Sequence, residues 1–201
     1  MVFRFIFTSS INTSEREELY VKCITKSLRI IKDMPFQIYL VENNGLRQTP
    51  FDDMSGVTLY YTDTNRLKSF GNIGVREFTD IILLAERYNF HENDIVIKLT
   101  GLYTMEEPNK FLKFVMDYAD RYDAFMKWLD VTNNNYFTPD CVLGLYAIRY
   151  KYIENFNYLE MMNHPSMEHI FAKHVREAVP EDRIAEIQHL GLFIEKWKML
   201  V

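Results

Sequence analysis

Hydrophobic and polar residues alternate along this chain in blocks that predict strands and amphipathic helices in turn. Short runs of β-branched and aromatic residues are typical of buried strands, whereas apolar residues three and four positions apart are typical of one helix face. The predicted strands are Phe3–Thr8, Phe36–Val41, Val57–Tyr61, Asp94–Lys98, Ala124–Trp128, Cys141–Ile148 and Ile184–Leu190.

Four helices are predicted between and after these strands. The first begins at a capping box, with Ser14 as the N-cap and Glu17 three residues later. The second covers Val75 to Tyr88, and Pro108 suits the first turn of the third. The fourth runs from about Met167 to Ala178 and is followed by a proline.

The alternation of strand and helix predicts the α/β class, with a mostly parallel sheet covered by helices on both faces. No repeat, low-complexity tract or flexible linker divides the 201 residues, so we expect a single domain over residues 1–201. Ligands bind at the carboxyl ends of parallel strands. Four polar segments are predicted to gather at that edge: Thr8–Ser10, Glu42–Gly45, Thr62–Asn65 and Lys98–Gly101.

The first two of these segments each have a ligand-binding and a structural interpretation. Thr8, Ser9 and Ser10 either contact a nucleotide or only lead into a helix, because the glycine spacing of a P-loop or dinucleotide fingerprint is absent. Glu42 and Asn43 either accept hydrogen bonds from a ribose or base or belong to a turn.

The third segment and the cations near it have the same two interpretations. Asp63 and Asn65 either hold a ribose or base edge or form an Asx turn. Lys68, Arg76 and Lys98 either neutralise a diphosphate or are solvated. Solvation suits Lys98 least, because a buried strand precedes it. The start of the helix near Gly74 adds backbone N–H groups and a positive dipole end.

Two carboxylates are candidates for work on an acceptor hydroxyl. Glu77 lies early in its helix, where it either favours the helix dipole or orients the hydroxyl. Asp130 ends the fifth strand, where it either acts as a general base or forms a turn. Trp128 either stacks on a sugar or base or belongs to the core.

Composition excludes several other classes. The net charge of −5 argues against a nucleic-acid partner. No apolar run approaches the length that crosses a bilayer, and the amino terminus lacks a signal-peptide pattern, so we expect no transmembrane segment and a cytoplasmic location. Cys23 and Cys141 are then expected to be reduced. No His/Cys cluster or zinc motif appears, so no residue is assigned to a metal.

Two stretches resemble a known family. Lys68 to Glu77 contains a loop and helix start with Gly74, and Asp94 to Tyr103 is similar to a Lys-x-Thr-Gly-Arg-Tyr signature. In these stretches and in the order of elements, the chain resembles the small GT-A glycosyltransferases of bacterial polysaccharide clusters and of large DNA viruses such as chloroviruses. The likeness to the fold covers roughly residues 3 to 148.

The resemblance implies a nucleotide-sugar donor, a glycan acceptor, and Lys98, Thr100, Gly101 and Tyr103 as site residues. The nucleotide-binding part would cover about residues 1–105 and the acceptor part about 106–201. Leu102 departs from the signature, where arginine is usual. The Asp-x-Asp that holds Mn²⁺ or Mg²⁺ in many such enzymes is replaced by Lys98-Leu-Thr, so the motif does not support a divalent metal. Either the lysine replaces part of the metal's charge, or other groups hold a Mn²⁺ or Mg²⁺ ion.

The expected function is transfer of a sugar from a UDP- or GDP-sugar to a glycan or other hydroxyl acceptor. The alternative is a non-catalytic nucleotide- or glycan-binding module of a larger glycan-synthesis enzyme. The missing acidic pair and Leu102 favour that alternative.

Overall fold

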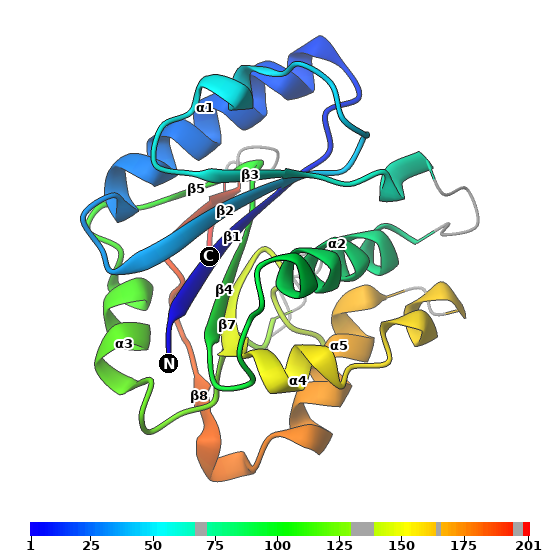
Figure 1. The fold of residues 1–201 in the computed structure, drawn as a ribbon. Coiled ribbons are helices and arrows are strands. Elements are labelled where there is room, and N and C mark those ends of the chain that lie inside the picture. Colours follow the sequence, from blue (N-terminus) through cyan, green and yellow to red (C-terminus); the bar gives the residue numbers. More distant parts are fainter. Residues whose placement is uncertain (67–71, 130–138, 164–165, 195–198) are drawn as a thin grey trace.

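The computed structural model describes residues 1–66, 72–129, 139–163, 166–194 and 199–201 (Figure 1). The predictions for Lys68 and Asp130 lie outside these ranges.

Seven of the described strands form one sheet in the order β3-β2-β1-β4-β7-β6-β8. All neighbours are parallel except β7, which runs antiparallel to β4 and β6. The predicted mostly parallel sheet is therefore confirmed. The strands are β1 Phe3–Ser9, β2 Phe36–Glu42, β3 Thr58–Tyr61, β4 Ile95–Thr100, β6 Ala124–Met126, β7 Leu145–Arg149 and β8 Ile184–Glu186.

Helices cover both faces of this sheet (Figure 1), as predicted. On one face lie α1 (Ser14–Ile31) and α3 (Lys110–Tyr118), and on the other lie α2 (Ile73–Arg87), α4 (Tyr150–Glu154) and α5 (Met167–Ala178). Successive strand side chains point to opposite faces, so Phe5 and Phe7 pack on the α1 side and Ile6 on the α2 side. Short 3-10 helices occupy Pro50–Asp53, Thr64–Arg66, Tyr158–Asn163 and Glu181–Arg183.

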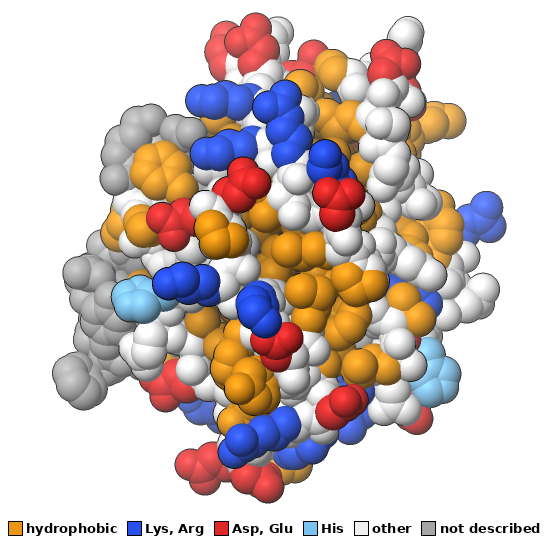
Figure 2. Space-filling model, turned by 90° about the vertical axis from the view of Figure 1, so that its left-hand side faces the viewer, with side chains coloured by type: hydrophobic (Ala, Val, Ile, Leu, Met, Phe, Trp, Pro, Cys, Tyr) orange, Lys and Arg blue, Asp and Glu red, His pale blue; other side chains and the backbone are white. Residues whose placement is uncertain are grey.

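The core on the α1 and α3 side reaches the surface, since Phe3, Phe36 and Phe114 pack against it while only partly buried. Figure 2 views the molecule from the left of Figure 1 and shows hydrophobic side chains gathered in the middle of that face, with charged ones around them.

Several details of the sequence prediction were wrong, among them the predicted strand Cys141–Ile148, which begins at Leu145. The N-cap of α1 is Thr13, whose side chain accepts from Arg16 N, so Ser14 is already helical. The N-cap of α3 is Asn109, which places Pro108 before the helix. The predicted strand Ile184–Leu190 ends at Glu186, and a second sheet was missed, formed by β5 (Tyr103–Met105), β9 (Leu192–Ile194) and β10 (Met199–Leu200). Strands of two or three residues show too little periodicity to be recognised.

The path of the chain creates a switch point beside the central strand β1. From β1 the chain passes through α1 to β2 and then to β3, and it next returns through α2 to β4 on the other side of β1. Because the two crossovers use opposite faces, their loops part at the carboxyl ends of β1 and β4. In open α/β sheets a crevice for ligands lies at such a point.

Buried ion pairs hold the opposite edge of the sheet. Arg4 and Asp94 lie 2.8 Å apart near the starts of β1 and β4. Asp123, just before β6, accepts from Arg149 and Arg183 at 2.6 Å each and from the Tyr152 hydroxyl at 2.9 Å. Burial raises the pKa of Asp123, but these hydrogen bonds outweigh burial and hold the pKa well below its ordinary value.

Replacing Asp123 with asparagine should lower the free energy of unfolding at pH 7 by about 3 kcal/mol, because two arginines lose their buried partner. The depressed pKa means that Asp123 stabilises the fold at neutral pH and loses this effect as the pH falls below the ordinary value of 3.8. Urea denaturation should therefore show the gap between wild type and variant narrowing in acid. The exposed Asp120→Asn is the control, and equal losses in both variants would contradict the assignment.

Candidate functional site at the carboxyl ends of β1 and β4

Four polar side chains meet at the switch point. Strand alternation places Thr8, Lys98 and Thr100 on the α2 side of the sheet, and Glu77 reaches them from α2. Glu77 Oε1 lies 2.8 Å from Lys98 Nζ and accepts from Thr8 Oγ1 at 2.6 Å. Lys98 Nζ also donates to Thr100 Oγ1 and to the Leu143 carbonyl, each at 2.8 Å. The structure thus brings together four of the residues predicted from sequence.

The lysine in this cluster is buried and fully engaged. Lys98 is 1% exposed, whereas the Glu77 side chain is 19% exposed. An ammonium group has three N–H donors, and Glu77, Thr100 and the Leu143 carbonyl take one each. Lys98 therefore has no remaining donor for a diphosphate in this arrangement, while Glu77 reaches the surface.

A second cluster lies on the α1 side, around Glu42. This fully buried carboxylate accepts from Ser9 Oγ at 2.7 Å, from Ile11 N at 3.2 Å, from Asn44 Nδ2 at 2.8 Å and from Arg47 Nη2 at 2.9 Å. Both of its oxygens are occupied by protein donors. In this structure Glu42 ties the loop after β1, which includes the half-buried Ser10, to the end of β2.

A third cluster centres on Asp80, which the sequence prediction missed. Asp80 lies on the buried face of α2 and accepts from Thr62 Oγ1 at 2.5 Å, Thr64 Oγ1 at 2.7 Å and Asn43 Nδ2 at 3.1 Å. Burial raises the pKa of Asp80 to about 6, although the three hydrogen bonds oppose the shift. An acidic residue between apolar helix positions was the one available signal for it.

Successive hydrogen bonds between side chains join the residues after β3 to α2. Arg76 donates to Asn65 Oδ1, and Asn65 Nδ2 donates to Asn44 Oδ1 at 2.6 Å. Asp63 instead forms an exposed ion pair with Arg66 at 3.1 Å. Arg76 is thus placed beside the strand ends, and Asp63 is turned toward solvent.

Two predicted site glycines are positions of close packing. A Cβ on Gly101 would lie 2.9 Å from Tyr20 Cδ1 and 3.0 Å from the Thr8 carbonyl oxygen, so α1 can approach the end of β4 only because this residue is glycine. A Cβ on Gly74 would lie 2.4 Å from Met167 Sδ, at the contact between the starts of α2 and α5.

The charge of Glu77 also acts on Tyr103 and Glu168. Burial raises the pKa of the Tyr103 hydroxyl, and the negative charges of Glu77 and Glu168 add to the shift. Glu168 lies in the first turn of α5, and its pKa is also raised, mainly by burial, with Asp140 and Glu77 contributing. Sequence gave no signal for Glu168, because acidic residues are common in first turns for reasons of helix stability.

The described residues at the end of β4 do not suit a divalent metal. An ammonium group there lies 2.8 Å from the carboxylate and 2.8 Å from the threonine hydroxyl, so a second cation would meet a positive charge. Within the described parts of the chain, no group of three or more His, Cys, Asp or Glu could hold a metal ion. Among the helices of the described residues, none is long and apolar enough to cross a membrane.

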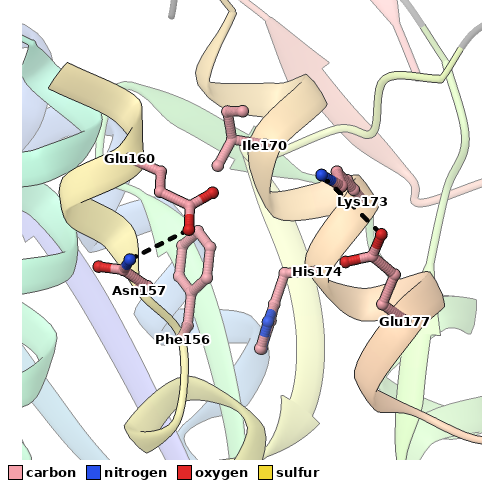
Figure 3. A pocket seen from close by; sticks show the side chains of 7 residues that line it. All are labelled: Phe156, Asn157, Glu160, Ile170, Lys173, His174 and Glu177. Atoms are coloured by element: carbon pink, nitrogen blue, oxygen red, sulfur yellow. Dashed lines mark hydrogen bonds and ion pairs between the residues drawn. The ribbon is translucent and has the colours of Figure 1, made fainter. Parts of the chain in front are cut away.

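Two further pockets are lined by residues other than the four of the switch-point cluster. One of them, drawn in Figure 3, lies between α5 and the segment from Phe156 to Glu160. It has a volume of about 130 Å³; in it Asn157 donates to Glu160 at 3.0 Å and Lys173 pairs with Glu177 at 3.9 Å. It is smaller than the pockets of roughly 300–1,000 Å³ that hold small ligands. The other, of about 460 Å³, is lined by Trp128, Arg176, Glu181, Ile184 and Glu186.

Trp128 is half-buried at the edge of this larger pocket. The Arg176 guanidinium lies 4.0 Å from the centre of its ring and donates to the Pro139 carbonyl at 2.6 Å. One face of the indole is therefore covered by a cation. The pocket adjoins β6 and β8, whose carboxyl ends share the edge of the sheet that carries the switch point.

No family model matches the sequence, and no curated protein sequence matches it. Solved structures do match. A putative nucleotide-diphospho-sugar transferase from Desulfovibrio desulfuricans has a TM-score of 0.58 and 9% identity over 93% of this chain and 80% of its own. A glycosyltransferase involved in glycosylation of the major capsid of PBCV-1 has a TM-score of 0.53 and 10% identity over 92% of this chain and 81% of its own.

Staphylococcus aureus TarS also matches, with a TM-score of 0.56 and 14% identity over 93% of this chain, which spans 35% of TarS. A shorter TarS chain in complex with UDP-GlcNAc has the same TM-score and identity over 93% of this chain and 56% of its own. These similarities show the fold, so the predicted GT-A-like architecture is confirmed.

The buried Asp80 gives a testable pH dependence. Its pKa is about 6 in the folded protein and 3.8 ordinarily, so folding favours the protonated form. Its contribution to the free energy of unfolding is therefore greatest below pH 4 and falls by about 3 kcal/mol as the pH rises through 6. The substituted side chain in Asp80→Asn does not titrate. The difference in free energy of unfolding between wild type and variant, measured by urea denaturation from pH 4 to 8, should therefore fall as the pH rises through 6. The control is Glu86→Gln, an exposed acid on the same helix. A pH-independent difference for Asp80→Asn would contradict the prediction.

Proposed function

We propose that this protein is a glycosyltransferase that moves a sugar from a UDP- or GDP-sugar to a hydroxyl of a glycan or other acceptor. The observation that carries the proposal is the polar cluster of Thr8, Glu77, Lys98 and Thr100 at the switch point of a GT-A-like sheet. The structural similarity to a putative nucleotide-diphospho-sugar transferase and to TarS in complex with UDP-GlcNAc supports the same reaction class.

In this proposal residues 1–105 bind the donor. The carboxyl ends of β1, β2 and β3 would hold the base and ribose, and TarS with UDP-GlcNAc supports that ligand class. Arg76, together with Lys68, would neutralise the diphosphate, whereas Lys98 donates its three hydrogen bonds to Glu77, Thr100 and the Leu143 carbonyl. The proposed donor-binding residues are Thr8, Ser9, Ser10, Glu42, Asn43, Asp63, Asn65, Lys68, Gly74, Arg76, Thr100, Gly101 and Tyr103.

Residues 106–201 would bind the acceptor. The pocket beside Trp128 has a volume of about 460 Å³ and carries Glu181 and Glu186, whose carboxylates can accept hydrogen bonds from sugar hydroxyls. Asp130 or Glu77 would receive the proton of the attacking hydroxyl. As that oxygen bonds to the anomeric carbon, the bond from this carbon to the diphosphate breaks, and the negative charge leaves with the nucleotide.

The second candidate function is a non-catalytic nucleotide- or glycan-binding module. It is favoured by the absence of an acidic pair at the end of β4 and by the saturation of Lys98 with internal partners. Incubating the protein with each donor and a panel of oligosaccharide acceptors separates the two functions. Release of nucleoside diphosphate supports the enzyme, and donor binding without release supports the module.

Isothermal titration calorimetry with UDP- and GDP-sugars tests the donor site, with and without Mn²⁺. We expect a Kd of about 1 mM or tighter for at least one donor. Arg76→Gln should weaken that binding roughly ten- to a hundred-fold, because a charge-assisted contact is lost. Arg87→Gln, in the exposed last turn of the same helix, should not. Absence of binding by every donor under both conditions would refute the proposed function.

A further inference from the structure

We infer that Lys98 is a positioning residue that acts through Glu77, and that Glu77 Oε2 engages the acceptor hydroxyl. This inference rests on the proposed function and assigns one step of it to named atoms. Lys98 would be an internal counter-ion and would not contact the donor.

Burial and saturation of Lys98 carry the first part of the inference. Its ammonium is 1% exposed and has an acceptor for each of its three N–H groups. To donate to a diphosphate it would have to break one of these bonds and leave a buried acceptor unsatisfied, which costs roughly 1–3 kcal/mol. The side chain also lies on the same face as Val96, beneath α2, rather than beyond the strand end.

The two oxygens of Glu77 carry the second part. Oε1 receives Lys98 Nζ and Thr8 Oγ1 from two different strands, at 2.8 and 2.6 Å, so the carboxylate cannot rotate without losing both. No donor among the described residues is bonded to Oε2, and the side chain is 19% exposed. One oxygen is thus fixed by the protein, and the other is available at the surface of the switch point.

The titratable groups around Glu77 explain why a cation is required beside its carboxylate. The titratable groups that influence or are influenced by Glu77 are Tyr20 on α1, Asp80 on α2, Tyr103 on β5, Tyr146 on β7 and Glu168 on α5. All of these are acids or phenols. Lys98 is the cation that lies within ion-pair distance of Glu77 in the described parts of the chain. Without Lys98, the Glu77 carboxylate would lose its ion-pair partner at 2.8 Å and keep, among the described residues, only the hydrogen bond from Thr8 Oγ1.

The proposed step is balanced in atoms and charge. The acceptor hydroxyl gives its proton to Glu77 Oε2 while its oxygen forms the new bond to the anomeric carbon of the donor. The bond from that carbon to the diphosphate oxygen breaks, and the nucleoside diphosphate takes the electron pair. Lys98 keeps its proton and its three hydrogen bonds throughout.

The test measures kcat, acceptor KM and donor Kd for Lys98→Met, Glu77→Gln and the double variant. We expect each single variant to lower kcat about 10²- to 10⁴-fold, the range for loss of a general base. Donor Kd should stay within about three-fold of wild type. The double variant should be no slower than the slower single variant, because residues that act as one unit are not additive.

A stability measurement separates positioning from folding. Lys98→Met leaves the Glu77 carboxylate unpaired, so it should also unfold at lower urea concentration. Pairing it with Glu77→Met removes both charges and should recover most of the stability but none of the turnover. Arg4→Met is the matched control, since it breaks a buried ion pair at the opposite edge and should leave the kcat of the folded protein unchanged.

Three results would overturn the inference. A ten-fold or larger rise in donor Kd with retained kcat in Lys98→Met would make Lys98 a diphosphate ligand. If the kcat losses of the single variants multiplied in Lys98→Met/Glu77→Gln, the two residues would act independently. If kcat recovered together with stability in Lys98→Met/Glu77→Met, the role of Lys98 would be structural. In each case donor binding by the wild type would persist, whereas wild type that binds no donor overturns the proposed function itself.

Discussion

The parallel pairing of β1 with strands on both sides is the constraint on which the rest of this structure depends. β1 pairs along its length with β2 and with β4. A parallel partner on each side requires a crossover on each face, and α1 and α2 are those crossovers. Their divergence opens the carboxyl ends of β1 and β4. Strand alternation then divides the polar residues, with Ser9 and Glu42 under α1 and Thr8 and Lys98 under α2.

Buried charged groups are paired at both edges of the sheet, but the exposure of their partners differs. At one edge, Asp123 is enclosed by Arg149, Arg183 and Tyr152, and its partners are all protein groups. At the edge that carries the switch point, Lys98 is also buried and bonded only to protein groups. Its carboxylate partner Glu77, in contrast, is partly exposed. A buried ion without a partner is costly, so Lys98 and Glu77 each stabilise the position of the other. A fixed carboxylate with one exposed oxygen is the chemical outcome.

Sequence periodicity predicted the sheet, its parallel character and the gathering of four strand ends, because each depends on local spacing and chain path. It could also place Lys98 near the edge. The periodicity could not predict that Lys98 pairs with Glu77, which lies 21 positions earlier on another element. A pattern predicts which face of an element a residue occupies, but not which atom its side chain contacts. Asp80 and Glu168 were missed for the same reason. Gly101 was expected to bind a ligand, and only the structure revealed its contact with Tyr20.

A lysine at the end of β4 changes the electrostatics that a GT-A-like sheet presents there. A pair of aspartates would create a negative site that must recruit a cation before a diphosphate can approach. Lys98 carries a permanent positive charge, and Glu77 cancels it at 2.8 Å, so the cluster is close to neutral. Net attraction for a diphosphate must then come from groups nearer the surface, of which Arg76 is placed beside the strand ends. The two cations therefore differ in depth: the buried Lys98 pairs with a carboxylate, and in the proposed function the shallower Arg76 contacts the diphosphate.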